Sequence, residues 1–393
     1  MSNRDLYSAY DLRGQVCIAG VAESELGRTP HRTVLSLQME AAAAALADAG
    51  MDKAEVDGIM VSGYPYAERQ AVLVAECLGI RPAFIDSTNI GGSGFEAAVE
   101  RAGAAIRAGL CNTVLICYGS TQYSSKTRSL GGRAPEFSYQ FEVPYGPALP
   151  LSGYALAATR HMHLYGTTSE QLAEVAVAAR QWAALNPKAI KRTPLTVAEV
   201  LASPVISTPL HGLDCCLVTD GGGAVIVTSA ERARALPKAP VYVLGTGTAM
   251  THEAITNMPE LTETAARESG RLAFARAGLT LAQIDVVQIY DSFTITVLLS
   301  LEDLGFCAKG EGGRFCSGGR LAPGGEFPLN TSGGGLSYCH PGMFGIFLLI
   351  EAVRQLRGEC GERQVPGVSL ALAHGTGGQL STAATVILGR EAL

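Results

Sequence analysis

The feature that most constrains this fold is an internal repeat of a glycine-rich turn, a helix and a strand. In the first half the repeat runs from a GGSG turn at 91–94, through a helix, to a strand that ends in Gly119. In the second half it runs from an HPG turn at 340–342, through a helix, to a strand that ends at Gly375. Two such units predict an α/β protein built from two duplicated βαβαβ halves.

The composition favours a large buried core and argues against a nucleic-acid partner. The chain has 393 residues, of which 47% are hydrophobic and 17% are charged, as in globular proteins. Its 46 glycines are spread along the chain, which indicates many tight turns. The net charge is −6 and no run is rich in lysine and arginine, so a nucleic-acid surface is not expected.

The sequence predicts no export signal, membrane span or metal site. The first ten residues are polar, and an apolar stretch at 345–350 is interrupted by Glu351. The ten cysteines form no CxxC pair. His161 and His163 lie two residues apart, so on a helix they would point to different faces. We therefore expect a cytoplasmic protein with reduced thiols and no bound metal.

The apolar patterns predict alternating strands and helices. Strands are expected at 16–21, 58–62, 84–86, 113–118, around Cys216, and at 223–228, 241–245, 286–289, 368–373 and 383–388. Helices are expected at 33–50, 71–78, 95–108, 153–164, 169–185, 262–277, 294–304 and 344–357. From about residue 120 to 152 the sequence is rich in serine, glycine, proline and aromatic residues. Residues from about 120 to 210 are expected to form an insertion. The two halves are then predicted at 1–235, which carries the insertion, and 236–393.

A second feature is the run NTSGGGLSYCHPG at 330–342, after which an amphipathic helix begins. A glycine-rich turn that leads into a helix presents backbone N–H groups to a developing negative charge, and its tyrosine and histidine can transfer protons. The run resembles the Asn-x-x-Gly-Gly…Gly-His-Pro block of thiolases, mainly of the sterol-carrier-protein-x or lipid-transfer-protein branch. The resemblance covers nearly the whole chain. It implies a duplicated thiolase fold with αβαβα layers and an inserted loop domain.

Against this family pattern, the nucleophile is missing. Thiolases take up the acyl group on a cysteine in the motif Cys-Gly-Ser-Gly-Leu-x-Ala, where a strand leads into a buried helix. The matching run here is GGSGFEA at 91–97, which places Gly91 at the cysteine position. A register shifted by one residue would place Ile90 there. Neither residue can be acylated.

Four side chains are candidates for catalysis. His340 keeps the family identity, which implies that it binds the thioester oxygen and stabilises an enolate. His374 replaces a second family cysteine that acts as acid and base, and Tyr290 stands where the family has a side chain that organises the oxyanion hole. Tyr338 has no standard thiolase counterpart. The alternative roles are structural: a strand-end cap for His374, a core position for Tyr290 and a turn-shaping role for His340.

An enolate-stabilising pocket with two tyrosines and no acyl-accepting cysteine fits retro-aldol cleavage of the Cα–Cβ bond of a β-hydroxyacyl-CoA. The pattern resembles the thiolase-like steroid side-chain aldolases, in which two tyrosines act without a cysteine nucleophile, and Tyr290 and Tyr338 map onto those roles. The candidate oxyanion and substrate-binding positions are Gly91, Asn330, Gly377 and Gly378.

The resemblance also implies partners. It predicts an acyl-CoA substrate, no tightly bound cofactor, a homodimer through the N-terminal half, and a small DUF35-type OB-fold protein that completes a heterotetramer. Two other functions stay open. One is an acetyl-CoA acyltransferase, a thiolase of β-oxidation, that uses an unrecognised nucleophile such as Cys339. The other is a non-catalytic subunit that binds acyl-CoA. The carbon skeleton of the substrate also stays open, with a steroid side chain as one candidate.

Overall fold

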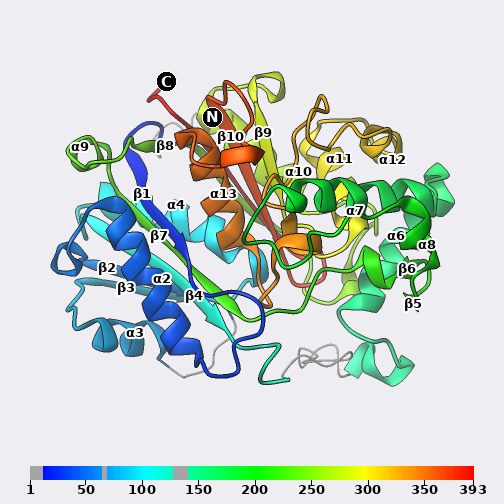
Figure 1. Cartoon of the computed structure of the whole chain (residues 1–393), viewed down its shortest axis with the longest axis horizontal. Coiled ribbons are helices and arrows are strands. Elements are labelled where there is room, and N and C mark those ends of the chain that lie inside the picture. The colour runs from blue at the N-terminus through cyan, green and yellow to red at the C-terminus, as the bar shows by residue number, and fades with distance from the viewer. Residues whose placement is uncertain (1–11, 64–68, 127–139) are drawn as a thin grey trace.

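A computed structural model of the chain describes residues 12–63, 69–126 and 140–393. Within these residues the main sheet is mixed and has the strand order β3-β2-β4-β7-β1-β8-β11-β10-β9, and a small hairpin pairs β5 with β6 (Figure 1). The strands are β1 Val16–Glu23, β2 Gly58–Ser62, β3 Phe84–Thr88, β4 Thr113–Ser120, β5 Val205–Ser207, β6 Leu210–His211, β7 Gly221–Ser229, β8 Val241–Met250, β9 Val286–Ile289, β10 Leu370–Gly377 and β11 Thr382–Gly389.

The sheet consists of two similar halves that meet at β1 and β8. In the N-terminal half β2 and β4 are parallel, β7 is antiparallel to β4, and β1 is antiparallel to β7. In the C-terminal half β9, β10, β11 and β8 repeat these relations in the same spatial order. The place equivalent to β3 is taken by a single parallel bridge between Val287 and Leu329. The expected duplication is therefore confirmed, whereas a division at residue 235 stays a prediction.

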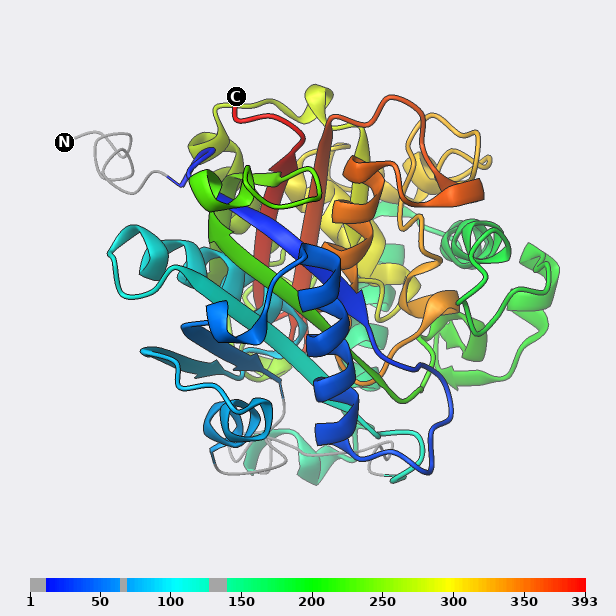
Figure 2. The same ribbon diagram turned by 60° about the vertical axis from the view of Figure 1, so that its left-hand side comes forward.

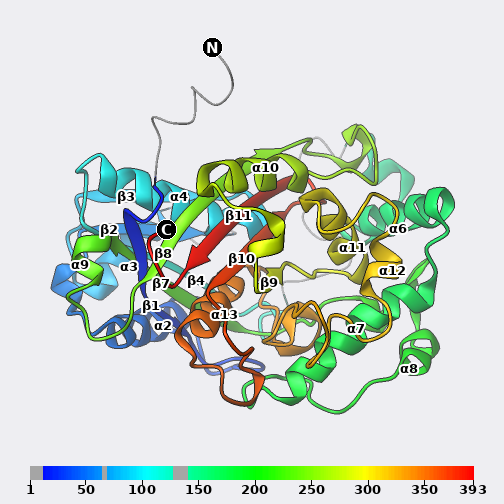
Figure 3. The same cartoon turned by 90° about the horizontal axis from the view of Figure 1, so that it is seen from above.

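The helices build three layers around the two half-sheets. Their bounds are α2 Val34–Ala49, α3 Gln70–Leu78, α4 Gly94–Arg107, α6 Leu151–Tyr165, α7 Ser169–Ala184, α8 Val197–Ala202, α9 Ala230–Ala233, α10 Ala266–Ala277, α11 Thr294–Leu304, α12 Gly312–Cys316 and α13 Gly345–Arg357. One outer layer contains α2, which lies across β1, β7 and β4 (Figure 2). The other contains α10, on the opposite side of β10 and β11 from α13 (Figure 3). Between the half-sheets, α4 contacts β7 and β11 while α13 contacts β7 and β10. This is the expected αβαβα arrangement.

Local sequence explains why the outer helix α2 has the predicted bounds. Thr33 caps its start, because the threonine hydroxyl accepts from the Ser36 N–H and the Ser36 hydroxyl accepts from the Thr33 N–H. Gly50 ends it in the left-handed conformation, with φ of 68°. The small alanines on its buried face let it approach β1 closely. A Cβ on Gly20 would lie 2.2 Å from the Ala45 carbonyl oxygen.

The insertion follows β4 and contains α6, α7, α8 and the β5–β6 hairpin (Figure 1). Helices α6 and α7 match the predicted ones closely. Two other expectations were wrong. Cys216 lies in no strand, because its N–H bonds to the Ser292 carbonyl and the neighbouring Cys215 forms one isolated bridge with Phe293. Helix α10 begins at Ala266 rather than at residue 262, because the Thr264 N–H and hydroxyl bind the Asp303 carboxylate. None of the helices in the described ranges is both long enough and apolar enough to span a bilayer.

Candidate active site

Four backbone segments meet at the carboxyl ends of β9 and β10, where ligands commonly bind in α/β sheets. They are the loop 90–93 before α4, the residues that follow β9, the run 330–342 before α13, and the turn 377–379 after β10. Within the run, Gly334–Tyr338 forms a π-helical turn. Elements far apart in the sequence therefore bring their loops to one place.

The centre of the site is a tyrosine–histidine pair. The Tyr290 hydroxyl lies 2.9 Å from Nε2 of His340, and the two rings meet edge to face. Both side chains are buried. Phe344, the residue before α13, packs against both rings. When Nε2 carries no proton, the phenol donates to it, so the pair can move a proton from the tyrosine oxygen to the imidazole.

The ring of Tyr290 takes the space that a side chain on the loop before α4 would need. A Cβ on Gly92 would lie 2.1 Å from Cε2 of Tyr290 and 2.7 Å from the Thr376 carbonyl oxygen. A Cβ on Gly91 would lie 2.5 Å from Cα of Gly377, and Gly91 has a φ of 71°. Because these contacts involve backbone and a packed ring, neither position accepts a cysteine in this conformation. The absence of the nucleophile is thus built into the packing of the site.

Asp291 holds the glycine-rich turn in place. Its buried carboxylate accepts a hydrogen bond from the Gly335 N–H at 2.6 Å and one from the Leu336 N–H at 3.2 Å. A Cβ on Gly334 would lie 2.1 Å from the same carboxylate, which explains the glycine there. Burial raises the pKa of the Asp291 carboxyl to about 7, although the two N–H donors oppose the shift. From the sequence alone, a short polar residue just before the helix predicted at 294–304 would be interpreted as a helix cap.

His340 and Asn330 are fixed by backbone hydrogen bonds. The His340 N–H donates to the Thr219 hydroxyl at 3.1 Å, and its carbonyl accepts from the Thr219 N–H. The Asn330 amide accepts from the Ile289 N–H and donates to the Ile289 carbonyl, each at 2.8 Å. Asn330 thereby holds the turn against the end of β9, which favours a positioning role over contact with the substrate.

Tyr338 lies in the same apolar cluster as Tyr290. Its ring packs edge-on against Phe344 and Phe347, and Phe344 also packs against Tyr290. Burial raises the pKa of the Tyr338 phenol well above its usual range, and the carboxylate of Glu23 adds to the rise. A proton donor fits this position better than a base. Its catalytic role stays a prediction.

His374 is the one candidate that the structure places elsewhere. Along β10 side chains alternate in direction, and Nδ1 of His374 bonds to the Thr385 hydroxyl at 2.9 Å, which in turn bonds to Ser269 of α10. Tyr290 lies on the other side, in the apolar cluster around α4 and α13. Burial lowers the pKa of His374 to about 3. Its backbone carbonyl, rather than its ring, reaches the site, by accepting from the Tyr290 N–H.

Cys339 is fully buried, and burial raises the pKa of its thiol well above the usual range. A thiolate is the reactive form of cysteine, so this position disfavours a nucleophile. Among the described residues, no group of three or more histidine, cysteine, aspartate and glutamate side chains could hold a metal ion.

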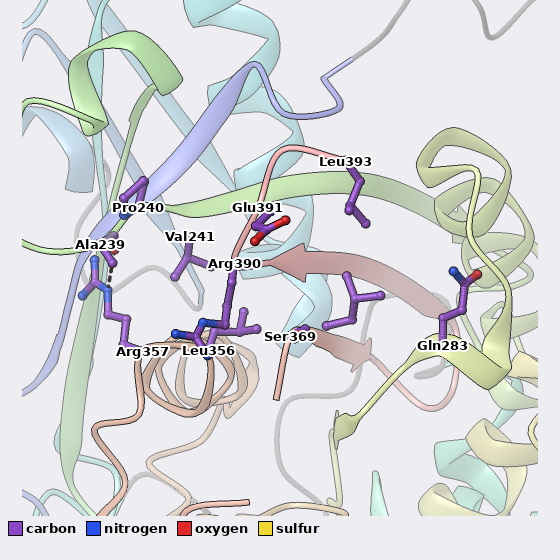
Figure 4. A pocket seen from close by; sticks show the side chains of 11 residues that line it. Ala239, Pro240, Val241, Gln283, Leu356, Arg357, Ser369, Arg390, Glu391 and Leu393 are labelled. Carbon is purple, nitrogen blue, oxygen red and sulfur yellow. Dashed lines mark hydrogen bonds between the residues drawn. The ribbon is translucent and has the colours of Figure 1, made fainter. Parts of the chain in front are cut away.

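A cavity of about 630 Å³ lies at the opposite end of β10 and is not part of this site (Figure 4). It is lined by the start of β8, the end of α13 and residues close to the C-terminus, including Arg357, Arg390 and Leu393. The Arg357 guanidinium is already bonded to the carbonyls of Ala239 and Ala19 and to Asp48. The cavity is about 20 Å from residue 377 if β10 is taken as an extended strand.

The family model "Thiolase C-terminal domain-like" matches residues 247–390, which include the pair and the turn 377–379. An acetyl-CoA acetyltransferase of Methanothermobacter thermautotrophicus is 35% identical over 95% of this chain and 99% of its own length. A steroid side-chain-cleaving aldolase of Thermomonospora curvata is 36% identical over 93% of this chain and 96% of its own length. The chain belongs to the thiolase superfamily.

Within this superfamily, a solved relative with a closely similar backbone is an Ltp2-ChsH2(DUF35) aldolase. It is 34% identical, has a TM-score of 0.88, and the match covers 96% of this chain and 98% of the other. The superfamily therefore includes relatives with acyl-transfer and with aldol chemistry at nearly equal sequence identity. The choice between the two reactions rests on the residues of the site.

Proposed function

We propose that the chain is a thiolase-like retro-aldolase, a carbon–carbon lyase that cleaves the Cα–Cβ bond of a β-hydroxyacyl-CoA. The observation that carries this proposal is the packing of Tyr290 against Gly92, with the Tyr290 hydroxyl on His340. A phenol ring that can move a proton packs against Gly92, next to the position of the thiolase nucleophile, and backbone of residues 377 and 378 fills the space of a side chain at that position, Gly91. Retro-aldol cleavage needs proton transfer and enolate stabilisation but no covalent acyl-enzyme.

The proton balance can be followed through the pair. Tyr290 takes the proton of the β-hydroxyl group as it passes its own proton to Nε2 of His340. The Cα–Cβ bond breaks, a ketone or aldehyde leaves, and the electron pair moves into the thioester as an enolate. The backbone N–H groups of the glycine-rich turns oppose the negative charge on its oxygen. Return of one proton to Cα gives the shortened acyl-CoA and restores the pair.

Substrate and partners follow from the relatives. The aldolase of Thermomonospora curvata is named for steroid side chains, so a steroid side-chain CoA thioester is the proposed substrate class. The name of the solved Ltp2 relative includes a DUF35 protein, so we include a DUF35-type partner in the proposed complex. A homodimer through the N-terminal half is supported by β3, an edge strand of the sheet on which Ile85 is 49% exposed. A cytoplasmic location stays a prediction from the cysteine pattern.

The second candidate is thiolytic acyl transfer. It is favoured by the acetyl-CoA acetyltransferase that matches nearly the full length. Against it stand the glycines at 91 and 92 and the buried, un-ionised thiol of Cys339.

One experiment separates the two reactions. The chain, with a DUF35-type partner, is incubated with β-hydroxyacyl-CoA and with β-ketoacyl-CoA substrates, each with and without free coenzyme A, and products are identified by mass spectrometry. We expect cleavage of the β-hydroxyacyl-CoA to a carbonyl compound without consumption of free coenzyme A. Cleavage of the β-ketoacyl-CoA that consumes coenzyme A would replace the proposal with acyl transfer. The Tyr290→Phe variant serves as the inactive control.

A further inference from the structure

Glu96 is a buried acid that the proposed reaction leaves unexplained. It lies in the first turn of α4, three residues after Ser93, and its side chain is 1% exposed. Neither carboxyl oxygen has a hydrogen-bond partner in the described part of the chain. An unpartnered polar group of this kind lowers the stability of the folded chain. A leucine would fill the same space without that cost, so the carboxyl group itself calls for a role.

The space for this carboxyl group is made by two glycines. A Cβ on Gly375 of β10 would lie 2.2 Å from Oε2 of Glu96, and a Cβ on Gly345, the first residue of α13, would lie 2.7 Å from it. The same point above Gly345 is only 2.1 Å from the Gly92 carbonyl oxygen. The Glu96 carboxyl and the Gly92 carbonyl therefore converge on one spot beneath the loop that packs against Tyr290.

Two oxygens that converge in a dry space repel each other unless one of them carries a proton. We propose that Glu96 is a positioning residue of the site, whose carboxyl group holds the Gly92 carbonyl and so keeps the loop 90–93 pressed against the Tyr290 ring. This role rests on the proposed function of Tyr290. It places a proton-bearing group beneath the loop that, in relatives with a cysteine, carries the nucleophile.

The surroundings keep Glu96 neutral. Burial raises the pKa of its carboxyl to about 8, and no charged side chain contributes to the shift. Gly345 and Gly375 present no side chain, the neighbouring Phe95 and Phe344 are apolar, and His374 points to the other face of β10. On α4 itself, Glu100 one turn further on is paired with Arg276. At neutral pH the Glu96 carboxyl is therefore mostly an un-ionised hydrogen-bond donor.

The first test does not depend on activity. Infrared difference spectra between pH 6 and pH 9 should show loss of a protonated-carboxyl band in the wild type that is absent from Glu96→Gln. Since the folded-state pKa is raised, the ionisation of Glu96 has no effect on stability below about pH 4.5 and lowers stability progressively up to about pH 8. The difference in Tm between Glu96→Gln and the wild type should therefore grow in favour of Glu96→Gln as the pH rises through this window. Glu100→Gln is the matched control, because the Glu100 carboxylate is ion-paired. This variant should keep the protonated-carboxyl band of the wild type and should show no pH-dependent rise in Tm relative to the wild type. An ionised Glu96 at pH 6 would overturn the proposal.

The second test measures positioning. Ultraviolet titration of each protein, minus the titration of the same protein with Tyr290→Phe, isolates the ionisation of Tyr290. The pH at which Tyr290 ionises should be the same in Glu96→Gln as in the wild type, and it should be shifted in Glu96→Leu. In the cleavage assay, Glu96→Gln should retain most of kcat and lose the fall in activity above pH 8. Glu96→Leu should lose at least tenfold in kcat with KM changed less than threefold. An unshifted Tyr290 ionisation in Glu96→Leu, or full kcat, would make Glu96 a core residue. A wild type without cleavage activity would remove the proposed function, while the ionisation measurement would still decide the role of Glu96.

Discussion

The two glycine-rich turns that open the central helices occupy equivalent places in the two halves, yet they carry different parts of the site. The turn before α4 presents Gly91 and Gly92 to the site and contributes no side chain there. The turn before α13 carries Tyr338, Cys339 and His340, and its backbone is fixed by Asp291. The difference teaches that the duplication supplies two equivalent scaffolds, and that in this chain one scaffold holds the candidate catalytic side chains while the other makes room for them.

The largest effect is expected where the two turns meet, at Tyr290. Tyr290→Phe keeps the ring that packs against Gly92 and removes only the hydroxyl on His340. Because that hydroxyl carries the proton, kcat should fall by about 10²–10⁴-fold. Steady-state kinetics with a β-hydroxyacyl-CoA measures this, and unchanged circular dichroism serves as the folding control. A near-normal kcat in this variant would mean that the tyrosine that packs against the turn before α4 is a core residue and not a catalytic one.

His340→Ala tests the turn that carries side chains. It removes the partner of the Tyr290 hydroxyl and, with it, the donor to the thioester oxygen that the family resemblance implies, so kcat should fall by about 10²–10³-fold. Because the two residues act as a pair, the kcat of the double variant should be only slightly lower than that of the less active single variant. Multiplying losses in the double variant would show that His340 and Tyr290 act independently.

Tyr338→Phe asks whether the second tyrosine of this turn takes part in the chemistry. The structure gives the Tyr338 hydroxyl no bond to His340 like that of Tyr290, so the effect of Tyr338→Phe should be smaller than that of Tyr290→Phe, about tenfold or more in kcat for a lost proton donor. The rate of exchange of solvent deuterium into the Cα position of the acyl-CoA product provides the specific readout. A wild-type exchange rate in Tyr338→Phe would show that Tyr338 takes no part in the reaction and that His340 is the catalytic side chain of this turn.

Gly92→Ala tests the turn that makes room. The added methyl group would meet the Tyr290 ring and the Thr376 carbonyl, so it should destabilise the protein by about 1–3 kcal/mol through overpacking. Gly94→Ala is the matched control two residues away, where an added Cβ would find its nearest neighbours at 3.5 Å or more. Chemical denaturation measures both. Equal stability of the two variants would show that the loop moves freely away from Tyr290.

The smallest effect is expected from cysteine alkylation. Cys339 is fully buried and un-ionised, so iodoacetamide at moderate excess should leave cleavage activity nearly unchanged. Peptide mass spectrometry would identify the modified sites, with exposed Cys77 as the internal positive control. Loss of activity in step with labelling of Cys339 would indicate that Cys339, in the turn before α13, acts as the nucleophile.

Much of the fold could be predicted from the sequence because its signals are local. The bounds of β2, β9 and α11 agree with the expected ones, since alternation, apolar runs and glycine ends lie within each segment. The joining of Tyr290 and His340 was implied by the family motif, which records the packing of distant loops. The short elements β5, β6, α8, α9 and α12 were not predicted, because they carry too few residues for a periodic signal.

The roles of His374, Asp291 and Glu96 could not be derived in this way. The role of His374 was taken from the family motif, so the strand alternation that turns its ring away from Tyr290 was not applied to it. Asp291 was interpreted as a helix cap because a short polar residue before a helix usually is one. Glu96 could not be recognised as buried, since nothing in a single sequence marks an acid whose space is made by Gly345 and Gly375, two glycines of the other half of the chain.

The contact between Tyr290 and Gly92 also has an evolutionary meaning. In this backbone a side chain at residue 92 would overlap the Tyr290 ring, and a cysteine at residue 91, the family position, would have its Cβ 2.5 Å from Cα of Gly377. A descendant that regained the cysteine without a shift of the loop would clash, and one that lost the tyrosine first would lose the hydroxyl that bonds to His340. Passage between the two chemistries would therefore require paired substitutions, and such epistasis tends to keep lineages separate after they diverge.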